Sequence, residues 1–227
     1  MRPIALVTGA NRGIGREVCR QLAELDYQVL LGSRSLEKGQ QTAKELGHPS
    51  IFPIELDVTN QVSVDKAAKE IESKYGLLDV LVNNAGINYD VDKQAISVDL
   101  TEVQRTMETN LYGPWKCTVS MLPLLQKSKN ARIVNVSSGA ASLTGMGGGT
   151  PAYGVSKAAL NALTLKLAGE LPGMRVNAVC PGWIATDMGG SGGGPIDQGG
   201  ASVVWACALG KDGPTGGFFR NSKPIDW

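Results

Sequence analysis

The sequence has few of the residues that bind metal ions or form disulfide frameworks. It contains one histidine, His48, and four cysteines without CxxC spacing, which are Cys19, Cys117, Cys180 and Cys207. A histidine-based metal site or a Ser-His-Asp triad would depend on His48 alone, so we expect neither, and no metal. Each cysteine lies in a segment with the pattern of a buried helix or strand, which favours reduced core thiols over disulfides.

The sequence also lacks a charge excess and a long apolar run. Its 22 basic and 21 acidic residues give a net charge of +1, so neither nucleic acid nor a membrane surface is an expected partner. The first apolar run, Ile4–Val7, is too short for a secretion signal or a membrane span. We therefore expect a cytoplasmic protein with a small-molecule substrate, unless a targeting segment has been removed from this sequence.

Short β-rich runs alternate with longer segments of helical period along the whole chain. The expected strands are 4–8, 28–31, 51–56, 80–82, 132–136, 175–179 and 217–219. The expected helical segments are 13–25, 36–46, 61–75, a long stretch to about 126, 152–169 and 196–209. This alternation predicts an α/β fold: a doubly wound, seven-stranded parallel Rossmann sheet with helices on both faces. No linker divides the chain, so we expect one domain over 1–227.

A glycine-rich turn follows the first expected strand and opens the first helix. It reads Thr8-Gly9-Ala10-Asn11-Arg12-Gly13-Ile14-Gly15. Glycines there let the chain turn tightly and let a diphosphate approach the backbone, while the helix N-terminus supplies N–H donors. An ordinary βα turn is the alternative, and the position directly after a strand argues against it. The TGxxxGxG spacing resembles the nucleotide motif of the short-chain dehydrogenase/reductase family, which implies a cofactor site at Gly9, Asn11, Arg12, Gly13, Ile14 and Gly15.

The end of the second expected strand indicates which nicotinamide cofactor is bound. NAD-dependent enzymes usually carry an acid there for the ribose 2′-hydroxyl, about 20 residues after the glycines. This sequence has Ser33 and Arg34 and no acid. Arg34, with Arg12 and the Ser33 hydroxyl, could hold a 2′-phosphate by charge-assisted hydrogen bonds, which favours NADPH/NADP+. Taken singly, either arginine could equally be a solvated surface charge.

Three later segments also resemble the family's cofactor site. Asp57 and Val58 follow the third expected strand, where the resemblance implies contact with adenine, and Asn84, Ala85 and Gly86 follow the fourth. After the sixth comes a PGxxxT segment, in which the resemblance implies contact with the nicotinamide carboxamide; its residues are Pro181, Gly182, Ile184 and Thr186. Alone, these patterns would indicate only a helix cap and turns. Their order and their positions at strand ends favour the functional interpretation.

Tyr153 and Lys157 lie four residues apart in a segment of good helix formers, so both side chains project from one helix face. A nearby cation, aided by the positive charge of an oxidised nicotinamide, favours phenolate, and we expect the two to lower the tyrosine pKa toward the working pH. A YxxxK pattern alone is weak evidence for a catalytic pair, and the family resemblance strengthens that interpretation. It implies that Ser138, with Ser137 as the adjacent alternative, holds the substrate carbonyl. It also implies that Asn110 holds a water in a proton relay; the alternative is a buried, satisfied helix asparagine.

The chain's ending, Gly213–Phe219 followed by Lys223–Trp227, resembles the carbonyl-reductase branch of the family. The resemblance implies an oxidoreductase that reduces aldehyde or ketone carbonyls by hydride transfer, with Tyr153 as general acid/base, and both Tyr153 and Lys157 contacting the cofactor. Monomeric members of that branch carry a long insertion before the tyrosine, and this chain has only the short loop 143–150. We therefore allow for a homodimer or tetramer.

Two other function classes compete with this interpretation. One is a nucleotide-binding sensor or scaffold without turnover, and the other is a non-redox enzyme such as an epimerase. The set Asn110, Ser138, Tyr153 and Lys157 argues against the sensor, and the glycine spacing argues against the epimerase. The glycine run 189–194 predicts a mobile lid and relaxed substrate specificity.

Overall fold

The computed structural model describes residues 2–227, so Met1, the first residue of the predicted domain, lies outside it. In the described part of the chain the strands form one sheet with the order β3-β2-β1-β4-β5-β6-β7-β8. Strands β1 to β7 pair in parallel and β8 is antiparallel to β7. The strands are β1 (Ile4–Val7), β2 (Gln28–Ser33), β3 (Ile51–Glu55), β4 (Val80–Asn83), β5 (Arg132–Val136), β6 (Arg175–Val179), β7 (Phe218–Arg220) and β8 (Lys223–Pro224).

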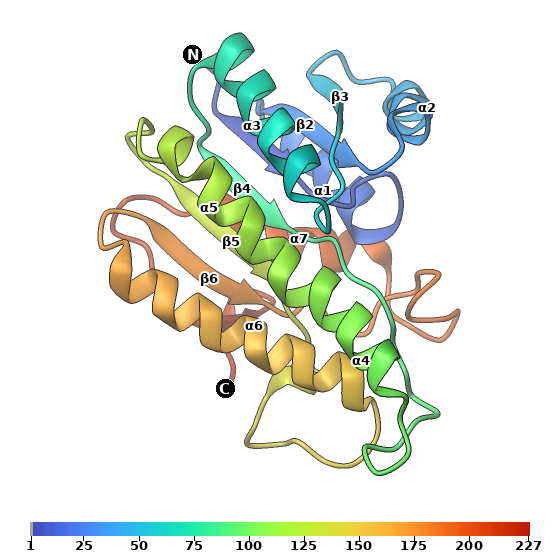
Figure 1. Ribbon diagram of the computed structural model, residues 1–227. Helices are drawn as coiled ribbons and strands as arrows, with labels where there is room; N and C mark the ends of the chain where they lie inside the picture. The colour runs from blue at the N-terminus through green and yellow to red at the C-terminus, as the bar shows by residue number, and fades with distance from the viewer. Residues whose placement is uncertain (1) are drawn as a thin grey trace.

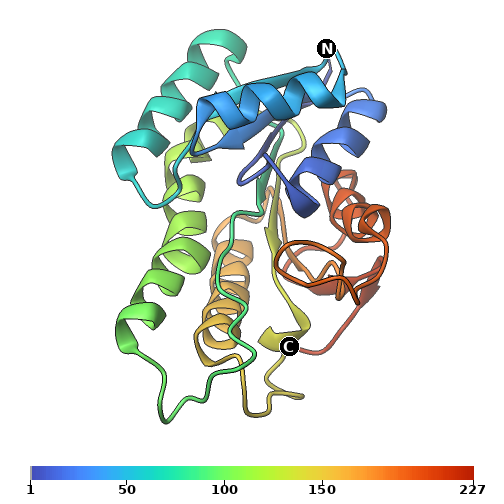
Figure 2. The ribbon, with the colours of Figure 1, turned by 90° about the vertical axis from the view of Figure 1, so that its right-hand side faces the viewer.

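Helices cover both faces of this sheet (Figures 1 and 2). The helices are α1 (Gly13–Glu24), α2 (Leu36–Leu46), α3 (Gln61–Tyr75), α4 (Leu100–Met107), α5 (Gly113–Leu125), α6 (Pro151–Glu170) and α7 (Ile196–Cys207). One core cluster contains side chains of α3, α5 and α6, and a second contains side chains of α1 and α7. The predicted doubly wound α/β fold is confirmed, and the expected bounds of α2 and α3 match the structure.

The central strands are buried on both faces, as the parallel sheet requires. Every residue of β1, β4 and β5 is buried, and apolar residues predominate in each strand. All four cysteines are buried and free of disulfides, which confirms their prediction as core thiols. None of the helices in residues 2–227 is both long and apolar enough to cross a bilayer.

The prediction of seven parallel strands misses β8. Phe219 pairs with Pro224 and Arg220 with Lys223, which makes β7 and β8 a hairpin. Its two turn residues, Asn221 and Ser222, both have positive φ, 50° and 63°, as a two-residue type I′ turn requires. A strand of two residues is too short to show an alternating pattern, so periodicity could not find it.

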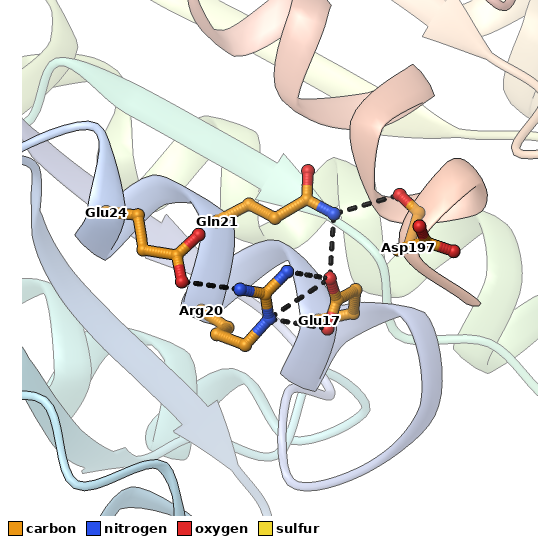
Figure 3. A network of polar contacts seen from close by, with 5 residues as sticks. All are labelled: Glu17, Arg20, Gln21, Glu24 and Asp197. Carbon is orange, nitrogen blue, oxygen red and sulfur yellow. Dashed lines mark hydrogen bonds and ion pairs between the residues drawn. The ribbon is translucent and has the colours of Figure 1, made fainter. Parts of the chain in front are cut away.

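A polar network joins α1 to the start of α7 (Figure 3). Glu17 is buried, and its carboxylate accepts hydrogen bonds from Arg20 and from Gln21 Nε2 at 2.7 Å. Gln21 Nε2 also donates to the backbone oxygen of Asp197 at 2.9 Å. The hydrogen bond with Arg20 holds the pKa of Glu17 below its usual value, although burial acts in the opposite direction. Since α7 follows the glycine run, the network fixes one end of that segment.

We expect Glu17→Gln to lower the free energy of unfolding by about 1–2 kcal/mol at pH 7, because a buried charged hydrogen bond is lost. A carboxyl group whose pKa is lowered in the folded state stabilises the protein at pH values above its unfolded pKa. This stabilisation is lost as the pH falls through the folded pKa. The difference in unfolding free energy between the wild type and Glu17→Gln should therefore shrink below about pH 4.5, the usual glutamate pKa. Urea denaturation between pH 4 and 8 measures it. Glu24→Gln, which also removes an Arg20 partner but at a side chain 56% exposed, should change little; an equal effect of both variants would contradict the prediction.

Candidate active site

The glycine turn between β1 and α1 presents free backbone donors to a cleft. Arg12 at the N-cap makes no side-chain cap hydrogen bond, and no acidic residue lies in the first helical turn. Gly9 and Gly13 have positive φ, 61° and 55°, and a Cβ on Gly9 would lie 2.8 Å from the Cα of Ala85. A Cβ on Gly13 would meet only Thr186, so this turn faces open space. Unpaired N–H groups at a helix N-terminus fit a diphosphate.

Asn84 connects this turn to the end of β4. Its side-chain nitrogen donates to the backbone oxygens of Thr8 and Gly9 at 2.9 and 3.2 Å. The hydroxyl of Thr8 in turn accepts from the backbone nitrogens of Asn84 and Ala85, both at 3.0 Å. A Cβ on Gly15 would lie 2.4 Å from the Asn84 side-chain nitrogen. The predicted Asn84-Ala85-Gly86 segment therefore supports the shape of the glycine turn.

A polar pocket at the ends of β2 and β3 holds the residues predicted for the adenosine half of the cofactor. Arg34 makes no ion pair within residues 2–227, whereas Arg12 pairs with Asp187 at 2.7 Å. Lys38 on α2 adds a cation that the sequence analysis did not include. One oxygen of Asp57 accepts from the backbone and hydroxyl of Thr59. The pocket is lined by Gly9, Asn11, Arg12, Ser33, Arg34, Ser35, Lys38, Leu56, Asp57, Val58, Thr59, Ala85, Gly86 and Thr109.

Tyr153 and Lys157 lie on the first turns of α6, and both are buried. The Lys157 Nζ donates to the backbone oxygen of Val136 at 2.7 Å, at the end of β5. It lies 5.8 Å from the centre of the Tyr153 ring. A Cβ on Gly86 would lie 3.5 Å from both Lys157 Nζ and Asn110 Oδ1, so the three predicted residues Asn110, Gly86 and Lys157 meet at one point.

Burial controls the protonation of this pair. It raises the pKa of Tyr153 to about 12, although the Ser138 hydroxyl acts to lower it. It also lowers the pKa of Lys157 to about 8. The protein's own groups do not produce the expected lowering of the tyrosine pKa, because desolvation of the phenolate dominates. The part of that expectation that depends on the nicotinamide charge stays a prediction. At neutral pH Tyr153 is a phenol, a proton donor.

Asn110 lies in a π-helical turn, Glu108–Tyr112, between α4 and α5, where the sequence analysis expected one long helix. Its oxygen accepts from the backbone nitrogen of Ile87 at 2.8 Å, and its nitrogen donates to Ile87 O and to Ser156 Oγ, both at 3.0 Å. Ser156 donates to the backbone oxygen of Tyr153 at 2.7 Å. Both polar atoms of the Asn110 side chain are thus hydrogen-bonded, and they connect the loop after β4 to α6.

The two adjacent serines after β5 have different surroundings. Ser137 is buried, and its hydroxyl donates to Asn161 Oδ1 at 2.7 Å. Ser138 lines an open pocket beside Tyr153, and its hydroxyl accepts from the backbone nitrogen of Ala140 at 3.2 Å. Because Ser137 is already bonded to a helix side chain, Ser138 is the serine that is available to a substrate.

The PGxxxT segment folds back on the glycine run and lines the same pocket. Gly194 N donates to Trp183 O at 2.8 Å, and Ala185 N donates to Gly194 O at 3.0 Å. A Cβ on Gly189 or Gly193 would lie 2.2 or 2.3 Å from the Ile184 backbone. The glycine run predicted a mobile segment, whereas at least two of its glycines, Gly189 and Gly193, allow close backbone packing against Ile184.

This geometry can be compared with known proteins. A sequence profile described as short chain dehydrogenase matches residues 3–193. The chain belongs to the short-chain dehydrogenase family. The (+)-neomenthol dehydrogenase of Capsicum annuum is 32% identical over a 300-position alignment that covers 96% of this chain and 96% of the relative. The NADPH-bound carbonyl reductase from chicken fatty liver superposes with a TM-score of 0.89 at 29% identity, over 100% of both chains. The Drosophila melanogaster carbonyl reductase Sniffer superposes with a TM-score of 0.85 at 32% sequence identity, also over 100% of both chains.

These likenesses confirm the predicted family and its oxidoreductase class. In this short-chain dehydrogenase all predicted cofactor residues border three adjoining pockets. The pocket beside the glycine turn is lined by Gly9, Arg12, Gly13, Ile14, Gly15, Asn84, Gly86, Val136, Ser137, Tyr153, Lys157, Pro181, Thr186, Asp187 and Met188. The next pocket adds Ser138, Gly182 and Ile184, together with three residues that sequence reasoning missed, Tyr89, Trp183 and Arg220. Tyr89 packs edge-on against Tyr153, with ring centres 5.2 Å apart.

Asp90 is a further residue that sequence reasoning missed. It is buried in the loop after β4, and its two oxygens accept from the backbone nitrogens of Ala152 and Tyr153 at 2.9 and 3.1 Å. The N-cap residue of α6, Thr150, makes no side-chain cap hydrogen bond. Asp90 therefore caps the helix of this short-chain dehydrogenase that carries Tyr153. Thr150-Pro151 resembles an ordinary helix start, so the sequence gives no sign of a cap 62 residues away.

We expect Asp90→Asn to destabilise the protein by about 2 kcal/mol and to lower kcat by about tenfold, because an amide cannot accept both hydrogen bonds and loses the charge that favours a helix N-terminus. Thermal unfolding and steady-state kinetics measure the two effects. Asp92→Asn is the matched control, since that side chain is 74% exposed in the same loop. A kcat at the wild-type level would mean that the cap does not position Tyr153.

Proposed function

We propose that the protein reduces aldehyde or ketone carbonyls to alcohols with NADPH as the hydride donor. The observation that supports this best is the position of Tyr153. It borders both the cleft beside the glycine turn and the pocket that contains Ser138. A proton donor thus lies between the cleft beside the glycine turn and an adjoining pocket of mainly apolar side chains. This arrangement suits a nucleotide cofactor and a small carbonyl substrate.

The choice of NADPH rests on the charges of the adenosine pocket. Arg34 and Lys38 border it, with Ser33 beside them, and the acid that an NAD-specific site would use at the end of β2 is absent. The unpaired guanidinium of Arg34 suits a 2′-phosphate. NADPH would be held there, by the free amides of the glycine turn, and by Ile184 and Thr186 at the nicotinamide end. When bound, it supplies the hydride.

The chain's own residues supply the proton and the orientation of the substrate. Tyr153, kept protonated by burial, would donate its phenol proton to the carbonyl oxygen, and Ser138 would hydrogen-bond and polarise the same oxygen. Lys157 would bind the cofactor ribose and return a proton toward Tyr153. Asn110, whose side chain connects the loop after β4 to α6, would maintain the backbone along this relay.

One assay tests the proposal against its competitors. NADPH absorbance is followed with a panel of aldehydes, ketones and diketones, and the same panel is repeated with NADH. We expect oxidation of NADPH with several carbonyls and a preference for NADPH over NADH that Arg34→Glu reverses. Cofactor binding without oxidation by any carbonyl would favour a nucleotide-binding sensor. Product formation without net cofactor oxidation would favour an epimerase.

We also propose that the chain forms a single domain that assembles as a homodimer or tetramer through α5 and α6, which lie on one face of the sheet (Figure 1). Trp115 and Val119 on α5, and Val155 and Leu165 on α6, are 45–59% exposed. Exposed apolar side chains on neighbouring helices are typical of an interface. We expect Trp115→Glu to reduce the mass measured by sedimentation to that of one chain. Wild-type protein of 23.9 kDa at micromolar concentration would contradict this.

A further inference from the structure

The substrate pocket is bordered by one cation, Arg220, the last residue of β7. It is the only charged side chain among the residues that border this pocket within the described chain. The hairpin with β8 holds its backbone in place through the pairing of Arg220 with Lys223. The pocket otherwise combines apolar side chains with the hydroxyls of Ser138 and Tyr153.

The guanidinium of Arg220 lies next to Gly139, the residue after Ser138. A Cβ on Gly139, the residue after Ser138, would lie 2.5 Å from Arg220 Nη2. Glycine at this position is therefore what lets the cation approach the backbone beside the predicted catalytic serine. A substrate whose carbonyl oxygen meets Ser138 would share its pocket with this cation.

Arg220 has no anionic partner among residues 2–227. Its Nε and Nη2 donate only to the Sγ of Cys180, at 3.3 and 3.1 Å, and no carboxylate of residues 2–227 forms an ion pair with it. A thiol sulfur is a weak acceptor, so most of the guanidinium's hydrogen-bonding capacity is unused. When a substrate displaces water from an apolar pocket, an unpaired cation loses solvation and gains most from an anionic ligand.

We propose that Arg220 binds a carboxylate of the substrate, so that the preferred substrates are oxo acids, aldehydes or ketones that carry a carboxylate group. This rests on the proposed carbonyl reduction and adds the charge of the substrate to it. The planar guanidinium matches two carboxylate oxygens, while Ser138 and Tyr153 hold the reacting carbonyl. Arg220 acts as a specificity-determining residue and takes no part in the transfer of the hydride or proton.

A matched pair of aldehydes tests this. 4-Carboxybenzaldehyde and methyl 4-formylbenzoate have the same ring and a similar size but differ in charge. Because the ester withdraws electrons more strongly and is the more reactive aldehyde, a higher kcat/KM for the acid reports the charge preference of the pocket. We expect the acid to be preferred by about tenfold or more. Arg220→Gln should remove that preference through the KM of the acid and leave the ester unchanged, while Arg220→Lys retains part of it. Lys223→Gln, which removes a cation from the opposite strand of the hairpin, should change neither.

The outcomes separate this inference from the proposed function. Equal kcat/KM for acid and ester in the wild type, or a loss in Arg220→Gln that affects both substrates equally, overturns the carboxylate site and leaves carbonyl reduction standing. The second result would mean that Arg220 only packs on Cys180. If no carbonyl causes NADPH oxidation, the proposed function fails and the substrate class fails with it.

Discussion

Tyr153→Phe is expected to lower kcat/KM for carbonyl reduction by about 10²–10⁴-fold, because it removes only the hydroxyl that donates the proton. The ring of Phe fills the same buried space against Tyr89, so the loss should not come from unfolding. The KM for NADPH should change little. Steady-state kinetics with a carbonyl found active in the panel measure the effect.

The control is Tyr89→Phe, because the Tyr89 hydroxyl makes no hydrogen bond within residues 2–227. We expect this variant to retain most of the activity. A Tyr153→Phe enzyme that works at the wild-type rate would remove Tyr153 from its proposed role. A loss of activity accompanied by a lower melting temperature would point to packing instead.

Lys157→Met should lower kcat/KM by about 100-fold or more without reducing stability at pH 7. Burial holds the pKa of Lys157 at about 8, below its unfolded value near 10.5, so the charged lysine is a cost to the folded state at neutral pH. Methionine fills similar space without a charge. The folded protein binds fewer protons than the unfolded chain between these two pKa values, so wild-type stability rises with pH from about 8.

Thermal unfolding from pH 6 to 10 checks the second half of this prediction. Below pH 8 the variant should be as stable as the wild type or more stable, and the difference should narrow at higher pH as the wild-type lysine loses its charge. A variant that is clearly less stable at pH 7 would show that the hydrogen bond to Val136 contributes more than desolvation costs. Lys166→Met, an exposed lysine on the same helix, should show no such pH dependence.

Sequence reasoning worked where one short segment determines the result. The apolar run Ile4–Val7 followed by a glycine turn predicted β1 and α1, because strand, turn and helix are local. The spacing of Tyr153 and Lys157 placed both on one helix face for the same reason. The oxidoreductase class came from the resemblance of these motifs to a known family.

It failed where residues distant in sequence act on one group. Asp90 caps a helix that begins 61 positions later, and nothing in its own neighbourhood distinguishes it from Asp92. Arg220 borders the substrate pocket because β7 pairs with β6, which brings it to Cys180, 40 positions earlier in the chain. The raised pKa of Tyr153 depends on burial by the whole fold, which outweighs the nearby lysine on which the sequence argument relied.

The short strand β8 has a consequence for how copies of this protein meet. An open sheet exposes unpaired backbone groups along its outer strands, which invite other chains to pair by strand addition. Here one outer strand, β3, contains Pro53, and the other consists of Lys223 and Pro224 alone. Proline offers no N–H, and a charged two-residue strand is a poor template. Both borders of the sheet are therefore poor templates for strand addition, which favours the proposed assembly through the helical face over pairing at a sheet edge.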